Sequence, residues 1–329
     1  MTIESLGVIG GGAWGTALAQ VAAGAGRETL LWVLEPEVAE SINSHHENRL
    51  YLPDVPLSPV IRATNELTDL ELCDAWLVVT PAQHMRSVLE QTPRCGRPLV
   101  LCSKGIEERS GKMLHYVAGE ICPQSTVAVI SGPTFAHEVA AGLPTAVTLA
   151  CEDSALANAL RERIALPTFR IYLSDDVTGA EIGGAVKNVL AIACGVVEGR
   201  RLGLNARAAL IARGFAEMTR FGLSLGAKPE TLTGMSGLGD LVLTCSSINS
   251  RNFSLGKGVA EGRSVAQLMS DRRTVAEGAF TAPVLRRLAE GAGVDMPIVA
   301  AVDDMLGGRA SVDEVLERLL TRPLRAEAR

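Results

Sequence analysis

Short apolar runs alternate with longer mixed segments through the first part of the chain. Val, Leu and Ile dominate the runs, which predicts strands at 6–9, 29–34, 75–80, 98–102, 127–130 and 146–150. The residues between them predict helices near 83–90, 111–120 and 153–164. Because apolar strands that alternate with helices are covered on both faces, we expect an α/β fold with a mostly parallel, doubly wound Rossmann-type sheet.

The pattern changes near residue 175, after which strand-like runs nearly vanish and helical segments follow one another. Two Ser-x-x-Gln/Glu pairs have the spacing of capping boxes, and two prolines are suited to first turns of helices. These residues are Ser264 with Gln267, Ser311 with Glu314, Pro283 and Pro297. We therefore predict two domains, an α/β domain at 1–175 and an all-helical C-terminal domain at 176–329.

One apolar, glycine-bearing stretch at 178–197 predicts a buried helix that links the two domains. It carries Lys187, and lysine is almost never fully buried without a partner. The lysine is therefore either reaching toward solvent or serving a function. Gly183 and Gly184, one turn earlier, would let a ligand approach closely.

The first predicted strand ends in a glycine-rich turn, GGGAWG at 10–15, and a helix-favouring segment follows it. Gly10 allows a tight turn, Gly12 lets the backbone approach a pyrophosphate, and Gly15 permits close packing of helix against strand. The phosphates would lie at the helix N-terminus, where N–H groups are unpaired. The turn therefore predicts a dinucleotide site, and an ordinary glycine-rich turn is the alternative.

Glu35 follows the second predicted strand, about 20 residues beyond Gly15, where a partner of the ribose 2′-hydroxyl is expected. It also precedes Pro36, so a solvated acid at the start of a helix is an equal alternative. Further along, Lys104 follows the strand at 98–102, and Gly132 and Thr134 follow the strand at 127–130. Ligands bind beyond the carboxyl ends of such strands, although Lys104 alone could be a solvated loop lysine.

Two polar islands lie in the second half of the chain. The first, GMSGLGDL, contains Asp240 after a run of glycines, and the second is Ser250-Arg251-Asn252. In a functional interpretation the carboxylate pairs with Lys187, and the guanidinium and amide form a clamp for an anion. In the alternative interpretation Asp240 is a helix N-cap and the second island is a helix start.

Composition restricts the partners. A net charge of -6 and a pI near 5.5 argue against nucleic acid or an anionic membrane surface. No signal segment is recognisable, and charges and glycines interrupt every apolar stretch, so we expect no membrane insertion and a cytoplasmic protein. The seven cysteines show no short repeating spacing and are expected to be reduced, and we expect no metal site.

Several blocks of sequence carry a family resemblance: GGGAWGTALA, SKGIE, ISGPTFAHEVAAGLPTA, GGAVKNVLAI, GLGDLVLTC, NSRN and VAEG. In this order they closely resemble bacterial-type NAD(P)-dependent glycerol-3-phosphate dehydrogenases over nearly the whole chain. The resemblance implies a metal-free cytoplasmic enzyme that reduces dihydroxyacetone phosphate to sn-glycerol 3-phosphate for phospholipid synthesis. It also implies a small phosphorylated substrate, and a homodimer is the candidate assembly.

The resemblance also assigns roles to residues. Lys187 falls on the proton donor and acceptor. Substrate contacts fall on Lys104, Gly132, Thr134, Asp240, Ser250, Arg251 and Asn252. Together with the glycine turn, the predicted cofactor contacts are Gly10, Gly12, Ala13, Trp14, Gly15, Leu34, Glu35, Lys104, Ala136, Arg251, Val275 and Glu277. Ala13 replaces a common serine and Leu34 replaces a common histidine or arginine, which changes the expected cofactor contacts but not the reaction. Glu35 would repel a 2′-phosphate and favour NAD, yet family members with an acid nearby can use NADP and Leu34 removes a common polar contact, so we expect activity with both NAD and NADP.

Two other functions are compatible with the residues. A 3-hydroxyacid dehydrogenase of the 6-phosphogluconate type also combines a Rossmann domain, a helical domain and a lysine near glycines. A non-catalytic dinucleotide sensor is the third interpretation, but it does not explain why a lysine lies on a buried helix. For catalysis, burial and a neighbouring cation would lower the pKa of Lys187, whereas Asp240 would oppose that change.

Overall fold

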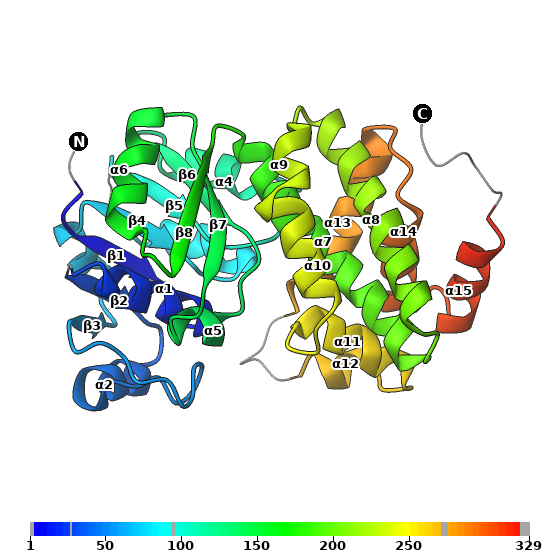
Figure 1. The fold of residues 1–329 in the computed structure, drawn as a ribbon, viewed down its shortest axis with the longest axis horizontal. Helices are drawn as coiled ribbons and strands as arrows, with labels where there is room; N and C mark the ends of the chain where they lie inside the picture. Colours follow the sequence, from blue (N-terminus) through cyan, green and yellow to red (C-terminus); the bar gives the residue numbers. More distant parts are fainter. Residues whose placement is uncertain (1–2, 27, 94–95, 271–275, 323–329) are drawn as a thin grey trace.

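The computed structural model describes residues 3–26, 28–93, 96–270 and 276–322 (Figure 1). Eight strands form one sheet in the order β3-β2-β1-β4-β5-β6-β7-β8, in which β6 and β7 are antiparallel and every other neighbouring pair is parallel. The strands are β1 Leu6–Ile9, β2 Thr29–Trp32, β3 Ile61–Thr64, β4 Ala75–Val78, β5 Leu99–Leu101, β6 Val127–Ser131, β7 Thr145–Ala150 and β8 Phe169–Ser174. The predicted doubly wound sheet is confirmed.

The six predicted strands are all present, whereas β3 and β8 were not predicted. These two strands lie at the edges of the sheet, and buried and more exposed side chains alternate along them. The central strands β1, β4 and β5 are instead buried along their whole length, which is typical of strands covered on both faces.

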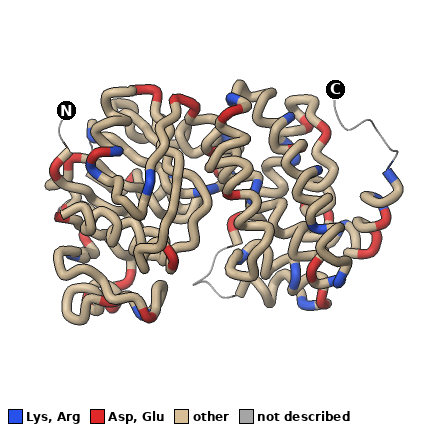
Figure 2. The backbone as a smooth tube through the Cα atoms, viewed as in Figure 1, with Lys and Arg blue, Asp and Glu red and all other residues tan. Residues whose placement is uncertain are grey.

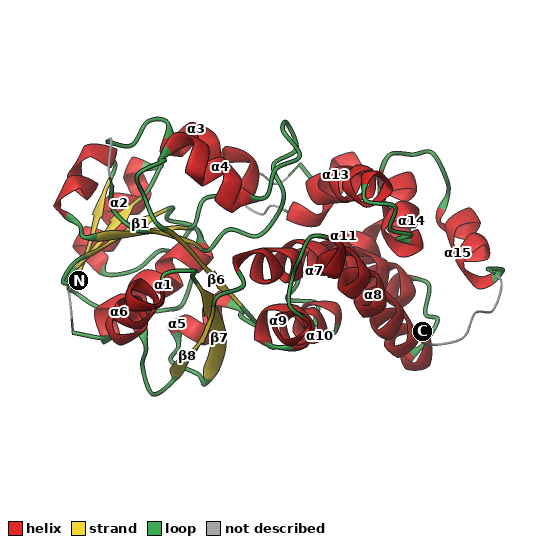
Figure 3. Cartoon of the chain, turned by 90° about the horizontal axis from the view of Figure 1, so that it is seen from above, coloured by secondary structure: helices red, strands yellow, loops and turns green. Residues whose placement is uncertain are grey.

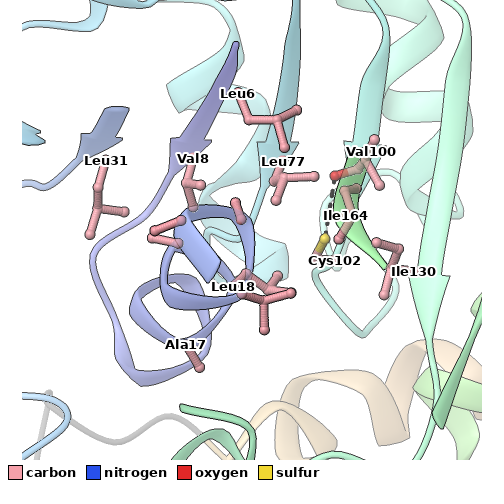
Figure 4. Packing of buried hydrophobic residues seen from close by; sticks show 14 of the residues in the cluster. Leu6, Val8, Ala17, Leu18, Leu31, Leu77, Val100, Cys102, Ile130 and Ile164 are labelled. Atoms are coloured by element: carbon pink, nitrogen blue, oxygen red, sulfur yellow. Dashed lines mark hydrogen bonds between the residues drawn. The ribbon is translucent and has the colours of Figure 1, made fainter. Parts of the chain in front are cut away.

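Helices cover both faces of the sheet, with α3 and α4 on one side and α1 and α6 on the other (Figure 3). The helices of this half are α1 Ala13–Gly24, α2 Pro36–His45, α3 Met85–Leu89, α4 Leu114–Ile121, α5 Ala136–Ala140 and α6 Ser154–Ile164, with short 3₁₀ turns η1 Leu67–Leu72 and η2 Ala82–His84. Figure 4 shows Leu18 of α1 and Ile164 of α6 packed beneath Val8, Leu77 and Val100 of the central strands. This packing fixes the start of α1 against the end of β1.

From Val177 onward the described residues contain helices and no strand. These elements are α7 Val177–Gly199, α8 Leu204–Ser224, α9 Pro229–Thr233, the π-helical turn η3 Met235–Gly239, α10 Asp240–Cys245, α11 Arg251–Ala260, α12 Val265–Leu268, α13 Glu277–Gly291, α14 Pro297–Leu306 and α15 Val312–Leu320. The predicted helical C-terminal part is confirmed. The predicted domain division, between residues 175 and 176, falls in the connection between β8 and α7.

Helix α7 is the centre of the helical half, and α8, α10, α11 and α13 pack around it. By length and composition it is apolar enough to span a membrane, which corrects the expectation that no such stretch exists. All of that apolar window is buried inside the protein. Its hydrophobicity is therefore explained by its central place in the core.

Both predicted capping boxes are present, at the starts of α12 and α15, and Pro297 lies in the first turn of α14 as predicted. The prediction for Pro283 was wrong, because this proline lies inside α13. Helix α13 begins at Glu277, whose charge is favourable in a first turn, about one and a half turns before the proline.

The two halves share a packed junction. Ile106 and Met113, from the connection between β5 and α4, belong to the hydrophobic core of the helical half. Asp176 caps α7 by accepting a hydrogen bond from the N–H of Gly179 at 2.7 Å, and it accepts a second from the N–H of Lys228 at 2.7 Å. In the view of Figure 2, acidic and basic residues are both scattered over the two halves.

Candidate active site

The glycine turn joins β1 to α1. Gly10 has a φ of +122°, and its N–H donates to the carbonyl of Trp32 at 3.0 Å. A Cβ on Gly15 would lie 1.8 Å from the carbonyl oxygen of Gly10, so only glycine lets α1 pack this closely. A Cβ on Gly12 would meet no atom of a described residue within 4 Å, and Gly12 caps α1 without a side-chain hydrogen bond. The turn therefore leaves open space at an uncapped helix N-terminus, which suits a phosphate.

The other predicted residues near this turn lie on α1 and at the end of β2. Ala13 and Trp14 occupy the first turn of α1, and the buried Nε1 of Trp14 has no hydrogen-bond partner in the described part of the chain. Leu34 is 71% exposed. Glu35 is the N-cap residue of α2, before Pro36, and its Oε1 accepts a hydrogen bond from the hydroxyl of Tyr51 at 2.7 Å. The helix-start interpretation is therefore correct for the backbone of Glu35. Its side chain is held by Tyr51, which the sequence analysis did not identify as a candidate residue.

Lys187 is buried on α7. Its Nζ donates to Oδ1 of Asp240 at 2.6 Å and to the hydroxyl of Thr244 at 2.9 Å. The other carboxylate oxygen of Asp240 accepts a hydrogen bond from Nζ of Lys104 at 2.6 Å, and Lys104 also donates to the carbonyl of Gly132 at 3.0 Å. One fully buried carboxylate therefore joins two lysines at the junction of the halves.

Burial has the largest effect on the pKa of Lys187. It lowers the pKa of Lys187 to about 8, and the positive charge of Lys104 acts in the same direction. Asp240 opposes the change, as expected, but does not cancel it. The competition that the sequence left open is therefore decided by desolvation.

Two interpretations of the glycines and of Asp240 need correction. Asp240 is the first residue of α10 and follows the cap residue Gly239, so the N-cap alternative was wrong. A Cβ on Gly183 would lie 2.2 Å from the carbonyl oxygen of Ser236, so this glycine admits the η3 backbone and not a ligand. Gly184 does border the site, because a Cβ there would lie 3.3 Å from Cγ of Lys104.

The island at 250–252 starts helix α11, as the alternative interpretation proposed. The hydroxyl of Ser250 accepts a hydrogen bond from the N–H of Phe253 at 3.3 Å, and Arg251 is exposed at the first helical position. Asn252 is buried; its Nδ2 donates to Oδ1 of Asn188 at 3.0 Å and its Oδ1 accepts from the N–H of Gly278 at 2.9 Å. The amide therefore fastens α11 to α7 and α13.

Glu277 is a second acid at the junction. Its Oε1 accepts a hydrogen bond from the N–H of Ala82 at 3.2 Å, whereas its buried Oε2 has no hydrogen-bond partner among the described residues. Burial raises the pKa of Glu277 to about 7, and the charge of Arg251 opposes that change. A Cβ on Gly105 would lie 3.6 Å from Oε2. An unpaired buried oxygen beside a strand end fits a hydrogen bond from a bound cofactor.

The structure thus brings the predicted residues together in groups. Lys187, Asp240, Lys104 and Gly132 form one cluster, and Arg251 interacts electrostatically with Glu277. Thr134 donates to the carbonyl of Gly132 at 3.3 Å, and Ala136 begins α5, which packs on α1. Val275 lies outside the described residues.

Sequence reasoning missed Thr244 and Asn188. Thr244 lies one helical turn after Asp240 on α10, where residues four apart face the same side. Asn188 directly follows Lys187 and is also buried. A search for polar residues at helical spacing from each candidate would have found Thr244.

Two family models match the chain. The N-terminal part of NAD-dependent glycerol-3-phosphate dehydrogenase matches residues 5–157, and its C-terminal part matches residues 176–317. A glycerol-3-phosphate dehydrogenase [NAD(P)+] of Erythrobacter litoralis is 62% identical over 99% of this chain and 98% of its own. A protein of the same name from Novosphingobium aromaticivorans is 62% identical over 99% of both chains.

Solved structures agree with these matches. The crystal structure of a glycerol-3-phosphate dehydrogenase from Coxiella burnetii is 37% identical, has a TM-score of 0.92, and covers 97% of this chain and 99% of its own. A D-mandelate dehydrogenase with a TM-score of 0.62 is only 13% identical, so it shares the fold alone. The glycine turn, the lysine–aspartate cluster and these full-length matches lead to one conclusion: the chain belongs to the NAD-dependent glycerol-3-phosphate dehydrogenase family.

Proposed function

We propose that the protein catalyses reversible hydride transfer between NAD(P)H and dihydroxyacetone phosphate, giving sn-glycerol 3-phosphate for glycerophospholipid synthesis. The observation that carries the proposal is the buried Lys187, which is held by Asp240 and Thr244 beside the ends of β5 and β6. A protonated amine whose pKa lies near neutrality is a suitable general acid. The names of the relatives support the same reaction.

The cofactor, when bound, supplies the hydride. The open space at Gly12 and the uncapped start of α1, with Ala13 and Trp14, suit its pyrophosphate. Glu35 at the end of β2 suits a ribose hydroxyl. The unpaired Oε2 of Glu277 offers an acceptor at the junction of the halves.

Lys187 would donate a proton from Nζ to the carbonyl oxygen as negative charge develops there, and in the reverse direction the neutral amine would take it back. Asp240 fixes the direction of this ammonium group through its bond of 2.6 Å. Lys104 adds a second positive charge, so two lysines against one aspartate leave the cluster positive. Such a fixed field stabilises a developing alkoxide without reorganisation.

The substrate phosphate would bind at the start of α11. Arg251 offers a planar fork of donors and is exposed there, so it can reach a phosphate. Asn252 uses one amide hydrogen for Asn188, which leaves its second amide hydrogen for a ligand. Binding energy from this phosphate would orient the carbonyl for reaction.

A two-by-two comparison tests the proposal. Specificity constants are measured for the wild type and Arg251→Ala with dihydroxyacetone phosphate and with dihydroxyacetone. Arg251→Ala should lose about 2–5 kcal/mol of transition-state stabilisation with the phosphorylated substrate, the range for an arginine–phosphate pair that is well desolvated when the substrate binds, and little with dihydroxyacetone. Arg263→Ala, which changes an exposed arginine of the same half, is the control.

If the loss caused by Arg251→Ala and the loss caused by removing the substrate phosphate are additive, Arg251 does not contact the phosphate. A preference for a 3-hydroxyacid over dihydroxyacetone phosphate would favour a dehydrogenase of the 6-phosphogluconate type. Dinucleotide binding without turnover of either substrate would favour a sensor.

We also propose that the enzyme works in the cytoplasm. The six cysteines in the described part of the chain are buried free thiols, which supports a reducing compartment. The homodimer stays a prediction, and light scattering on the purified protein measures it.

A further inference from the structure

The connection between α2 and β3 carries two polar side chains that the proposed reaction does not use, Asn48 and Tyr51. Both reach elements of the dinucleotide site. The segment forms its own short bridge between Asn48 and Leu52, so its backbone is ordered at this point.

Asn48 ties this segment to the glycine turn. It is fully buried, and its Nδ2 donates to the carbonyl of Gly11 and to the hydroxyl of Thr16, both at 2.9 Å. Its Oδ1 accepts a hydrogen bond from the N–H of Tyr51 at 3.1 Å. The position of Tyr51 is therefore fixed relative to the turn that faces the phosphates.

Tyr51 in turn holds Glu35. Its hydroxyl donates to Oε1 of Glu35 at 2.7 Å, and both side chains are partly buried. Glu35 lies two residues past Val33, against which Gly11 packs so closely that a Cβ would lie 2.2 Å from Cγ1 of Val33. The carboxylate is thus anchored beside the turn, at the place where the adenosine ribose of a dinucleotide would lie.

We propose that Tyr51 is a positioning residue that sets the preference between NAD and NADP by holding the Glu35 carboxylate toward the ribose. In this orientation the carboxylate accepts a hydrogen bond from a 2′-hydroxyl and repels a 2′-phosphate. Without the Tyr51 hydroxyl the side chain of Glu35 turns toward solvent and both effects weaken. The inference rests on the proposed function, because it requires that a dinucleotide binds at this turn.

The test is direct calorimetric binding of NADH and of NADPH to the full chain, without substrate. The proteins are the wild type, Tyr51→Phe, Glu35→Gln and the double variant. Tyr172→Phe, on the opposite edge strand β8, is the matched control. Thermal melts verify that each variant is folded, and Glu35→Gln probes the same contact from its other side.

Tyr51→Phe should lower the ratio of the NADPH to the NADH dissociation constant by roughly three- to tenfold, the effect of one ordinary hydrogen bond. Glu35→Gln should lower it at least as much. In the Glu35→Gln background, Tyr51→Phe should change the ratio by less than about twofold, because its partner's charge is already gone.

Three results would overturn the inference: an unchanged ratio in Tyr51→Phe, an unchanged ratio in Glu35→Gln, or equal effects of Tyr51→Phe in both backgrounds. Failure of the wild type to bind either dinucleotide would instead overturn the proposed function, and this inference with it. Dihydroxyacetone phosphate reduction by the wild type with an unchanged ratio in Tyr51→Phe would overturn the inference alone.

Discussion

Asp240 and Glu217 are the two most deeply buried carboxylates among the described residues of the helical half, and their partners differ. Asp240 contacts the ammonium groups of Lys187 and Lys104. Glu217, on α8, accepts hydrogen bonds from the N–H groups of Ile298 and Val299 at the start of α14. The first acid joins side chains from three distant segments, whereas the second satisfies a helix end.

The different partners lead to different expectations for the two acids, one concerning catalysis and the other concerning stability. Asp240 fixes the orientation of the Lys187 ammonium group at the junction of the halves, where we propose that the substrate binds. At Glu217 the dominant effect is desolvation, and burial raises the pKa of this acid to about 7. We therefore expect changes around Asp240 to alter turnover and its pH dependence, and a change at Glu217 to alter stability.

Removal of Lys187 should have the largest effect. Lys187→Ala should lower kcat by roughly 10²–10⁴-fold, the contribution of a general acid, while NADH binding changes little. Stopped-flow kinetics and calorimetric binding measure the two quantities. Lys257→Ala, a partly exposed lysine on α11, is the control. Near-wild-type turnover in a folded Lys187→Ala protein would refute the assignment.

Replacing the charge of Asp240 tests the same site from the acid's side. In the proposed mechanism reduction needs protonated Lys187, so the rate of reduction should fall as the pH rises through about 8, the pKa of Lys187. Asp240 raises that pKa, so in Asp240→Asn the fall should move to lower pH, by roughly one to three units. The measurement is the pH profile of kcat/KM for reduction. A profile that stays in place would mean that the carboxylate does not tune the lysine.

Glu217→Gln should act on stability alone. The pKa of Glu217 rises from 4.5 to about 7 on folding, so the folded state binds the proton more tightly than the unfolded state. That contribution is complete below about pH 4.5 and is lost as the pH rises through about 7. Relative to Glu217→Gln, the wild type should lose up to about 3 kcal/mol of unfolding free energy between pH 5 and 8.

Urea titrations at the two pH values measure this difference, with Glu162→Gln, at an exposed acid on α6, as the control. Unchanged kcat in Glu217→Gln is the second part of the expectation. A large loss of turnover would remove the distinction between the two buried acids.

Cofactor choice should show the smallest effect, because neither buried acid faces the adenosine end of the dinucleotide site. We expect activity with both NADH and NADPH, and their specificity constants should differ by less than about 100-fold, or about 2.7 kcal/mol. Initial rates with each reduced cofactor measure this ratio. Strict use of one cofactor would show that Glu35 or Leu34 discriminates more strongly than expected.

Local patterns were sufficient for most of the fold. Continuous apolar runs identified the six inner strands, and the two Ser-x-x-Gln/Glu pairs identified the starts of α12 and α15. The edge strands β3 and β8 escaped notice because exposed residues interrupt them. The prediction for Pro283 was wrong because α13 already begins at Glu277, whereas a proline suits the first turn of a helix only when the helix starts next to it.

The site divides in the same way. The glycine turn is contiguous, and the sequence by itself determined it, because φ at Gly10 and the contact at Gly15 depend on neighbours in the chain. The Lys187–Asp240–Lys104 cluster joins residues as far apart as 136 positions, so only the tertiary structure decided their contact. Tertiary structure also decided the pKa of Lys187 and the hydrogen bond from Tyr51 to Glu35. Desolvation and side-chain direction depend on the residues that pack around a side chain and not on its neighbours in the sequence.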